Sequence, residues 1–159
     1  MSVDLARRSW LIHGRSQKNS VRPPWSLPEV LFTDHCTRCG ACVEACPEQL
    51  IYPGDGGFPE LRFEQSGCDF CGACARSCPT QAISPDLVNK PWEHHFTIHN
   101  HCLTTQQVFC NSCLDDCSEQ AIVFDLTSAI ARPHIDPIRC SGCGLCVSAC
   151  PVSAIGIQT

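Results

Sequence analysis

Four cysteine repeats, numbered 1 to 4 along the chain, limit what this sequence can fold into. Repeats 1, 2 and 4 share the spacing C-x2-C-x2-C-x3-C-P and end at Pro47, Pro79 and Pro151. In repeat 3, seven residues separate the first two cysteines, and Ser118 stands in place of the proline. Its tail, residues 119–122, nevertheless parallels the tails of the other repeats and places Cys117 in register with their last cysteines. Such an internal repeat fixes the architecture before any helix or strand is assigned.

The density of cysteine restricts both the chemistry and the compartment. The 159 residues include 16 cysteines, which indicates disulfides, zinc or iron-sulfur clusters. Disulfide scaffolds require export. Ala6–Ile12 resembles a twin-arginine export signal, but polar residues 13–18 follow where an apolar stretch should run. No apolar run approaches the roughly 20 residues that cross a bilayer, so we expect a cytoplasmic protein with reduced thiols and no direct membrane insertion.

Charge is unevenly distributed along the chain. Five of the 11 basic residues precede the first cysteine, and the remainder of the chain is acidic. Those five are Arg7, Arg8, Arg15, Lys18 and Arg22. An acidic body repels phosphate backbones, so we expect no nucleic-acid partner.

The cysteine spacing is typical of 4Fe-4S clusters. A cubane cluster needs a thiolate at each of its four irons, and a C-x2-C-x2-C loop can supply three. In bacterial two-cluster ferredoxins, the last cysteine of each run, before the proline, ligates the other cluster. Small residues between the cysteines, such as Gly40, Gly72 and Gly144, let backbone N–H groups approach the cluster sulfurs. The predicted ligands are Cys36, Cys39, Cys42, Cys46, Cys68, Cys71, Cys74, Cys78, Cys102, Cys110, Cys113, Cys117, Cys140, Cys143, Cys146 and Cys150.

Repeat 3 leaves alternatives open. Its long gap and missing proline allow a zinc site or an empty remnant, although four retained cysteines favour a fourth cubane. Four histidines precede Cys102, and imidazole replaces thiolate in some clusters. Because Cys102 completes a set of four cysteines, these histidines are expected to be solvated or to face a partner; they are His94, His95, His99 and His101.

The segments between the repeats predict the fold class and the domains. Apolar residues 50–52 and 61–63 flank the turn residues 53–57, and residues 122–126 lead toward residues 135–138, so we expect a β-hairpin within each half. The prediction is an α+β, ferredoxin-like chain of two tandem bacterial 2x4Fe-4S units with short helices. Its divisions are a basic arm (1–27), unit 1 with repeats 1 and 2 (28–85), a linker (86–101) and unit 2 with repeats 3 and 4 (102–159). We expect repeat 1 to pair with 2 and 3 with 4; the alternative pairs 1 with 4 and 2 with 3.

A fully ligated cubane has no open iron on which a substrate could bind, so its chemistry is one-electron transfer. The sequence contains no phosphate-binding loop or nucleotide fingerprint, and no cysteine remains to serve as a nucleophile. We therefore expect that the protein is not an enzyme.

Four further features can be compared with known families: the arm with Arg7-Arg8, residues 22–26, the irregular third repeat and the closing residues 150–155. Together they resemble the NapF family of ferredoxin-type proteins from periplasmic nitrate reductase operons. That resemblance implies a cytoplasmic protein that binds NapA, the catalytic molybdenum subunit, before its export and assists its maturation. The alternative function is an electron-transfer ferredoxin or relay subunit of a respiratory oxidoreductase. An iron-sulfur sensor ranks last, because no basic DNA-binding region follows the clusters.

Overall fold

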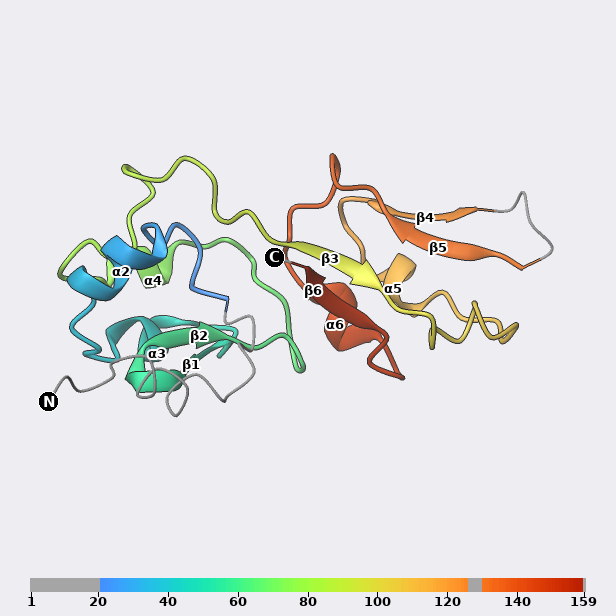
Figure 1. Cartoon of the computed structure of the whole chain (residues 1–159), viewed down its shortest axis with the longest axis horizontal. Coiled ribbons are helices and arrows are strands. Elements are labelled where there is room, and N and C mark those ends of the chain that lie inside the picture. The colour runs from blue at the N-terminus through green and yellow to red at the C-terminus, as the bar shows by residue number, and fades with distance from the viewer. Residues whose placement is uncertain (1–20, 126–129, 159) are drawn as a thin grey trace, which may run out of the picture.

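The protein is a chain of short helices and two-stranded sheets arranged in two halves (Figure 1). The computed structural model describes residues 21–125 and 130–158. The first half contains α2 (Glu29–His35), α3 (Ala41–Ala45), β1 (Ile51–Pro53), η1 (Asp55–Gly57), β2 (Pro59–Leu61) and α4 (Ala73–Arg76). The second contains β3 (His95–Ile98), α5 (Ser112–Asp115), β4 (Ile122–Asp125), β5 (Arg132–Ile135), α6 (Leu145–Ala149) and β6 (Ile155–Gln158). No helix in the described part of the chain could cross a membrane.

All four cysteine repeats end in the same turn. The third residue after each last cysteine has a left-handed backbone, with φ of 52° at Gln49, 56° at Gln81, 50° at Gln120 and 51° at Ser153. Each of these residues donates its N–H to the carbonyl of the last cysteine, at 3.0 to 3.4 Å. The turn directs the next two residues inward, so that pairs such as Ala121 and Ile122 are buried. The register deduced for Cys117 is therefore confirmed.

A short helix follows the second cysteine of every repeat. In the three regular repeats the residue before the helix is a glycine with positive φ: 80° at Gly40, 71° at Gly72 and 82° at Gly144. Only glycine adopts this backbone without steric cost. Repeat 3 has Asn111 at the same place, with φ of −132°, so its longer loop enters α5 along a different path.

Two of the sheets are the hairpins expected from the sequence. Strand β1 pairs with β2, and Ile51 lies opposite Leu61. Strand β4 pairs with β5, and Ile122 lies opposite Ile135. The apolar partners face the core, which is why each hairpin has a defined register.

The third sheet was not expected. Strand β3 lies within the segment assigned above as the linker 86–101, and it pairs antiparallel with β6 at the end of the chain (Figure 1). Phe96 of β3, which is buried, lies opposite Ile157. The first half has a single bridge at the corresponding place, between Ser26 and Ile83. The segment 86–101 is therefore partly a strand of the second half and not simply a connector.

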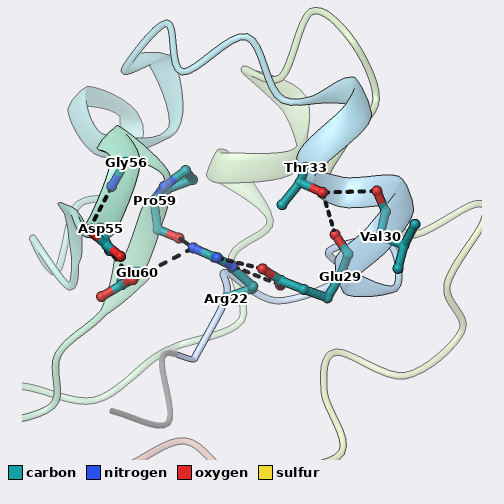
Figure 2. Close-up of polar contacts among 8 residues, drawn as sticks. All are labelled: Arg22, Glu29, Val30, Thr33, Asp55, Gly56, Pro59 and Glu60. Carbon is teal, nitrogen blue, oxygen red and sulfur yellow. Dashed lines mark hydrogen bonds and ion pairs between the residues drawn. The ribbon is translucent and has the colours of Figure 1, made fainter. Parts of the chain in front are cut away.

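The end of the predicted arm packs on the first half. Figure 2 shows Arg22 between α2 and β2: its guanidinium donates two hydrogen bonds to the Glu29 carboxylate, at 2.6 and 3.0 Å, and one to the Pro59 carbonyl, at 3.2 Å. The hydrogen bond from Arg22 lowers the pKa of Glu29. The guanidinium also lies over the rings of Phe32 and Phe58. Arg22 therefore joins the arm, the helix and the hairpin, whereas Arg7 and Arg8 lie outside the described residues.

Candidate metal centre

Three cysteines of repeat 1 meet the last cysteine of repeat 2. Cys36, Cys39, Cys42 and Cys78 line one hollow, and this set is called site A. The walls between the thiols are largely apolar and include Phe32 and Ile83. Cys78 thus lies where the sequential pairing of repeats 1 and 2 places it.

Site B is the reciprocal set: Cys46, Cys68, Cys71 and Cys74. Cys46 and Cys74 both raise the pKa of Cys68 through their charge, and Cys46 and Cys71 do the same to Cys74. Charge effects of this kind place Cys46 near Cys68 and Cys74, and the other four cysteines of the first half already line site A. Three of these residues come from repeat 2 and one from repeat 1.

The second half repeats this arrangement with the irregular repeat included. Site C consists of Cys117, Cys140, Cys143 and Cys146, which line one hollow with the buried Ile122. Site D consists of Cys102, Cys110, Cys113 and Cys150, which line another with the buried Ile155. All 16 predicted cysteines therefore fall into four sets of four. The long loop between Cys102 and Cys110 does not remove either residue from its set.

Sites within one half are neighbours. Cys74 of site B and Cys42 of site A are close enough for the charge of Cys74 to raise the pKa of Cys42. Cys113 of site D has the same effect on Cys146 of site C. The shared helix pairs, α3 with α4 and α5 with α6, hold these neighbours together.

Burial makes the free thiols hard to ionise. It raises the pKa of Cys42, Cys74 and Cys113 to about 11 and that of Cys68 and Cys146 to about 12, with neighbouring cysteines adding to the effect. An unpaired thiolate is unstable at such positions. A bound cation removes that penalty, and metal binding therefore releases the protons.

Backbone N–H groups point at several of these sulfurs. The N–H of Ala121 lies 3.3 Å from Sγ of Cys117, and that of Ala154 lies 3.1 Å from Sγ of Cys150. Burial opposes ionisation of Cys78, but N–H groups of Ile83, Thr80 and Ala82 and the Thr80 hydroxyl outweigh it and lower its pKa. Donors of this kind stabilise thiolate ligands and the negative sulfurs of a cluster. Cys117 has this contact without a following proline.

The spread of the thiols fits a cluster better than a single ion. Within the ranges 21–125 and 130–158, no three His, Cys, Asp or Glu side chains are grouped tightly enough to hold one metal ion. Zinc requires its thiolates within about 2.3 Å of one point. In a cubane each thiolate binds a different iron, so the ligands stand around a larger volume. The three hollows of sites A, C and D, each lined by four cysteines, have this form.

The expectation that all four histidines are solvated or partner-facing is wrong for His94. Its side chain is buried, with 7% of its surface exposed, and packs against Phe63, Trp92 and Phe96. Burial lowers its pKa to about 4, which keeps the ring neutral. His95, the next residue and the first of β3, is exposed. Buried and exposed side chains alternate from His94 into β3, and that strand was not predicted.

The loops of sites B and C touch each other across the two halves. The N–H of Cys68 donates to the carbonyl of Cys143 at 2.7 Å. Trp92 Nε1–H donates to the carbonyl of Ser141 at 3.1 Å, beside the same loop. Sequence reasoning missed this contact because it joins residues from distant parts of the chain that have no shared pattern.

The fold and the sites define the class of this protein as an iron-sulfur protein of the dicluster ferredoxin type. The chain matches the 4Fe-4S dicluster domain family at residues 35–98 and again at residues 108–154. The first matched segment contains repeats 1 and 2 and the second contains most of repeats 3 and 4; together they cover more than half of the chain.

Curated relatives then identify the particular family. The chain is 44% identical over 158 residues to the ferredoxin-type protein NapF of Escherichia coli K12, with 98% of this chain and 95% of the relative covered. It is 43% identical over 136 residues to NapF of Haemophilus influenzae, with 85% and 77% covered. The methylamine utilization ferredoxin-type protein MauM of Methylophilus methylotrophus is 32% identical over 156 residues, with 87% and 69% covered. The chain belongs to the NapF family of ferredoxin-type proteins.

Proposed function

We propose that sites A to D each hold a 4Fe-4S cluster and that the 16 cysteines are the ligands. The observation that carries this proposal is the division of every cysteine into four sets of four, each built from two repeats. The halves are then two tandem ferredoxin-like units: residues 28–85 form the first, and residues 102–159 together with β3 form the second. In each unit the two clusters cross-link the two repeats. When bound, the clusters supply one-electron transfer.

The protein's residues hold and shield these clusters and do not act on an organic substrate. Buried side chains such as Ile83, Ile122 and Ile155 keep water from the sites, and backbone N–H groups stabilise the sulfurs. With every corner ligated by cysteine, no iron is open to a substrate. The proposed role is therefore that of an electron-handling protein and not of an enzyme.

We infer that this chain is a cytoplasmic accessory protein that assists the maturation of NapA, the catalytic subunit of periplasmic nitrate reductase, before its export. Membership of the NapF family over nearly the whole chain supports this role. The acidic body behind a basic arm also fits a protein partner better than nucleic acid.

A binding experiment tests the maturation role. Cluster-loaded protein, immobilised without oxygen, is expected to retain the NapA precursor with its signal sequence and to retain the mature subunit less. Deletion of the gene is expected to lower nitrate reductase activity. No retention of the precursor, together with full activity in the deletion strain, would overturn this role.

The second candidate function is an electron-transfer ferredoxin or relay subunit of a respiratory oxidoreductase. The contact between the loops of sites B and C favours this function, because a relay needs each cluster to lie close in space to the next one. Reduction by a cellular donor followed by rapid oxidation by an acceptor enzyme would support this function. A protein that binds the precursor but exchanges no electrons would exclude it.

A further inference from the structure

The two halves meet at the ligand loops of sites B and C. Cys68 opens repeat 2 and lies in site B, whereas Cys143 lies in repeat 4 and site C. Their 2.7 Å hydrogen bond joins the two ligand residues through their backbones. Only covalent bonds and this one hydrogen bond separate the two sulfur atoms along that path.

Trp92 makes a second connection between the same loops. Its ring lies 5.3 Å from that of Phe70, which stands between Cys68 and Cys71. On the other side it packs against Gly142, where an added Cβ would lie 2.3 Å from Trp92 Nε1. The ring thus touches the loop of site B and the loop of site C, and its hydrogen bond to Ser141 fixes its orientation.

An aromatic cluster packs beside this contact. Phe63 from the first half is 4% exposed and packs edge-to-face on Trp92 and on Phe96. It also covers Gly144, where an added Cβ would lie 2.1 Å from the Phe63 ring. This aromatic packing holds the loops of sites B and C against each other.

We propose that the Cys68–Cys143 contact, oriented by Trp92, is the bridge through which one electron passes between the halves, so that the four sites form one chain in the order A, B, C, D. This inference rests on the proposed function, because it requires a cluster in each site. The transfer moves one electron from site B to site C or back, and no proton or bond changes. Trp92 and Phe63 are positioning residues in this scheme.

Gly67 offers a way to open the bridge without touching a ligand. A Cβ at Gly67 would lie 2.7 Å from the backbone nitrogen of Leu145 and 3.0 Å from the carbonyl oxygen of Cys143. Because backbone atoms cannot move aside cheaply, Gly67→Ala is expected to push the halves apart. Gly54→Ala is the matched control, since its Cβ would meet the flexible side chain of Glu60 within the same half.

The experiment uses the full cluster-loaded chain and two readouts. The first is amide hydrogen exchange at Cys68, expected to be about tenfold faster in Gly67→Ala than in the wild type because the hydrogen bond is lost. The second is EPR of the reduced protein. Gly67→Ala is expected to lose the part of the magnetic splitting that arises between the halves and to keep the part within each half. Gly54→Ala is expected to match the wild type in both.

Several results would overturn the bridge. One is an unprotected Cys68 amide in the wild type; another is faster exchange in Gly67→Ala with unchanged splitting. If Gly67→Ala does not retain its iron, Trp92→Phe replaces it, because the ring contact with Phe70 stays while the hydrogen bond to Ser141 is lost. Unchanged exchange and splitting in Trp92→Phe would also count against the bridge. A wild type with about 8 irons would instead refute the cluster loading on which the bridge rests.

Discussion

Cys78 and Cys36 line the same hollow, although Cys78 closes repeat 2 and Cys36 opens repeat 1. The same exchange places Cys46 with the first three cysteines of repeat 2. Neither repeat of the first half can complete its site alone. The pairing of outer with inner repeats would require Cys150 beside Cys36, but Cys150 lines site D.

Paired substitutions can test this exchange. Cys36→Ala and Cys78→Ala are each expected to lower the iron content by about 4 atoms, and the double variant by about 4 as well, because both residues serve one site. Cys78→Ala combined with Cys71→Ala is expected to lower it by about 8. Iron and acid-labile sulfide are measured on protein purified without oxygen. A loss of about 8 iron atoms in the variant that combines Cys36→Ala with Cys78→Ala would contradict the shared site.

The irregular repeat 3 is expected to contribute a full site. The wild type should contain about 16 irons and no zinc, and Cys110→Ala about 12 irons, since site D would lose its cluster. Cys143→Ala, a change in a regular repeat, is the control and should cause the same loss. A wild type with about 12 irons and one zinc would assign repeat 3 to zinc.

Arg22 is expected to stabilise the first half. Arg22→Ala removes the two hydrogen bonds to Glu29, the one to Pro59 and the packing on Phe32, and should lower the free energy of unfolding by about 1–2 kcal/mol. The control is Arg139→Ala, because Arg139 is exposed and lies 3.6 Å from Asp136 in a surface pair worth about 0.5 kcal/mol. Denaturant unfolding of the loaded protein measures both. Equal effects would show that Arg22 has no special role.

Much of the candidate site could be predicted because it is local. The C-x2-C-x2-C spacing wraps three ligands within one short loop, and the tails after Cys46 and Cys117 repeat the same turn, so the chemistry and the hairpins follow from neighbouring residues. Even in the irregular repeat 3, residues 119–122 were enough to align Cys117 with the last cysteines of the other repeats.

The contacts between the halves could not be predicted in this way. Phe63, Trp92 and Gly142 lie far apart in sequence, and none belongs to a periodic pattern that would indicate a partner. Strand β3 was missed because residues 95–98 contain only two strongly apolar residues, Phe96 and Ile98, among polar neighbours. Hydrogen bonding to β6 at the end of the chain makes this segment a strand. The burial of His94 follows from that strand and from the aromatic residues around it.

The buried His94 is expected to make stability depend on pH. Burial lowers its pKa to about 4 from the usual 6.5, with the charge of His95 adding to the shift, so the folded protein binds this proton less readily than the unfolded chain. Stability is therefore full above pH 6.5 and is lost as the pH falls toward 4, by about 1 kcal/mol between pH 7.5 and 5.5. His94→Phe should remove this loss, whereas His95→Gln, at the exposed neighbour, should keep it. Denaturation midpoints at both pH values, measured without oxygen, provide the comparison; the same pH dependence in the wild type and His94→Phe would contradict the assignment.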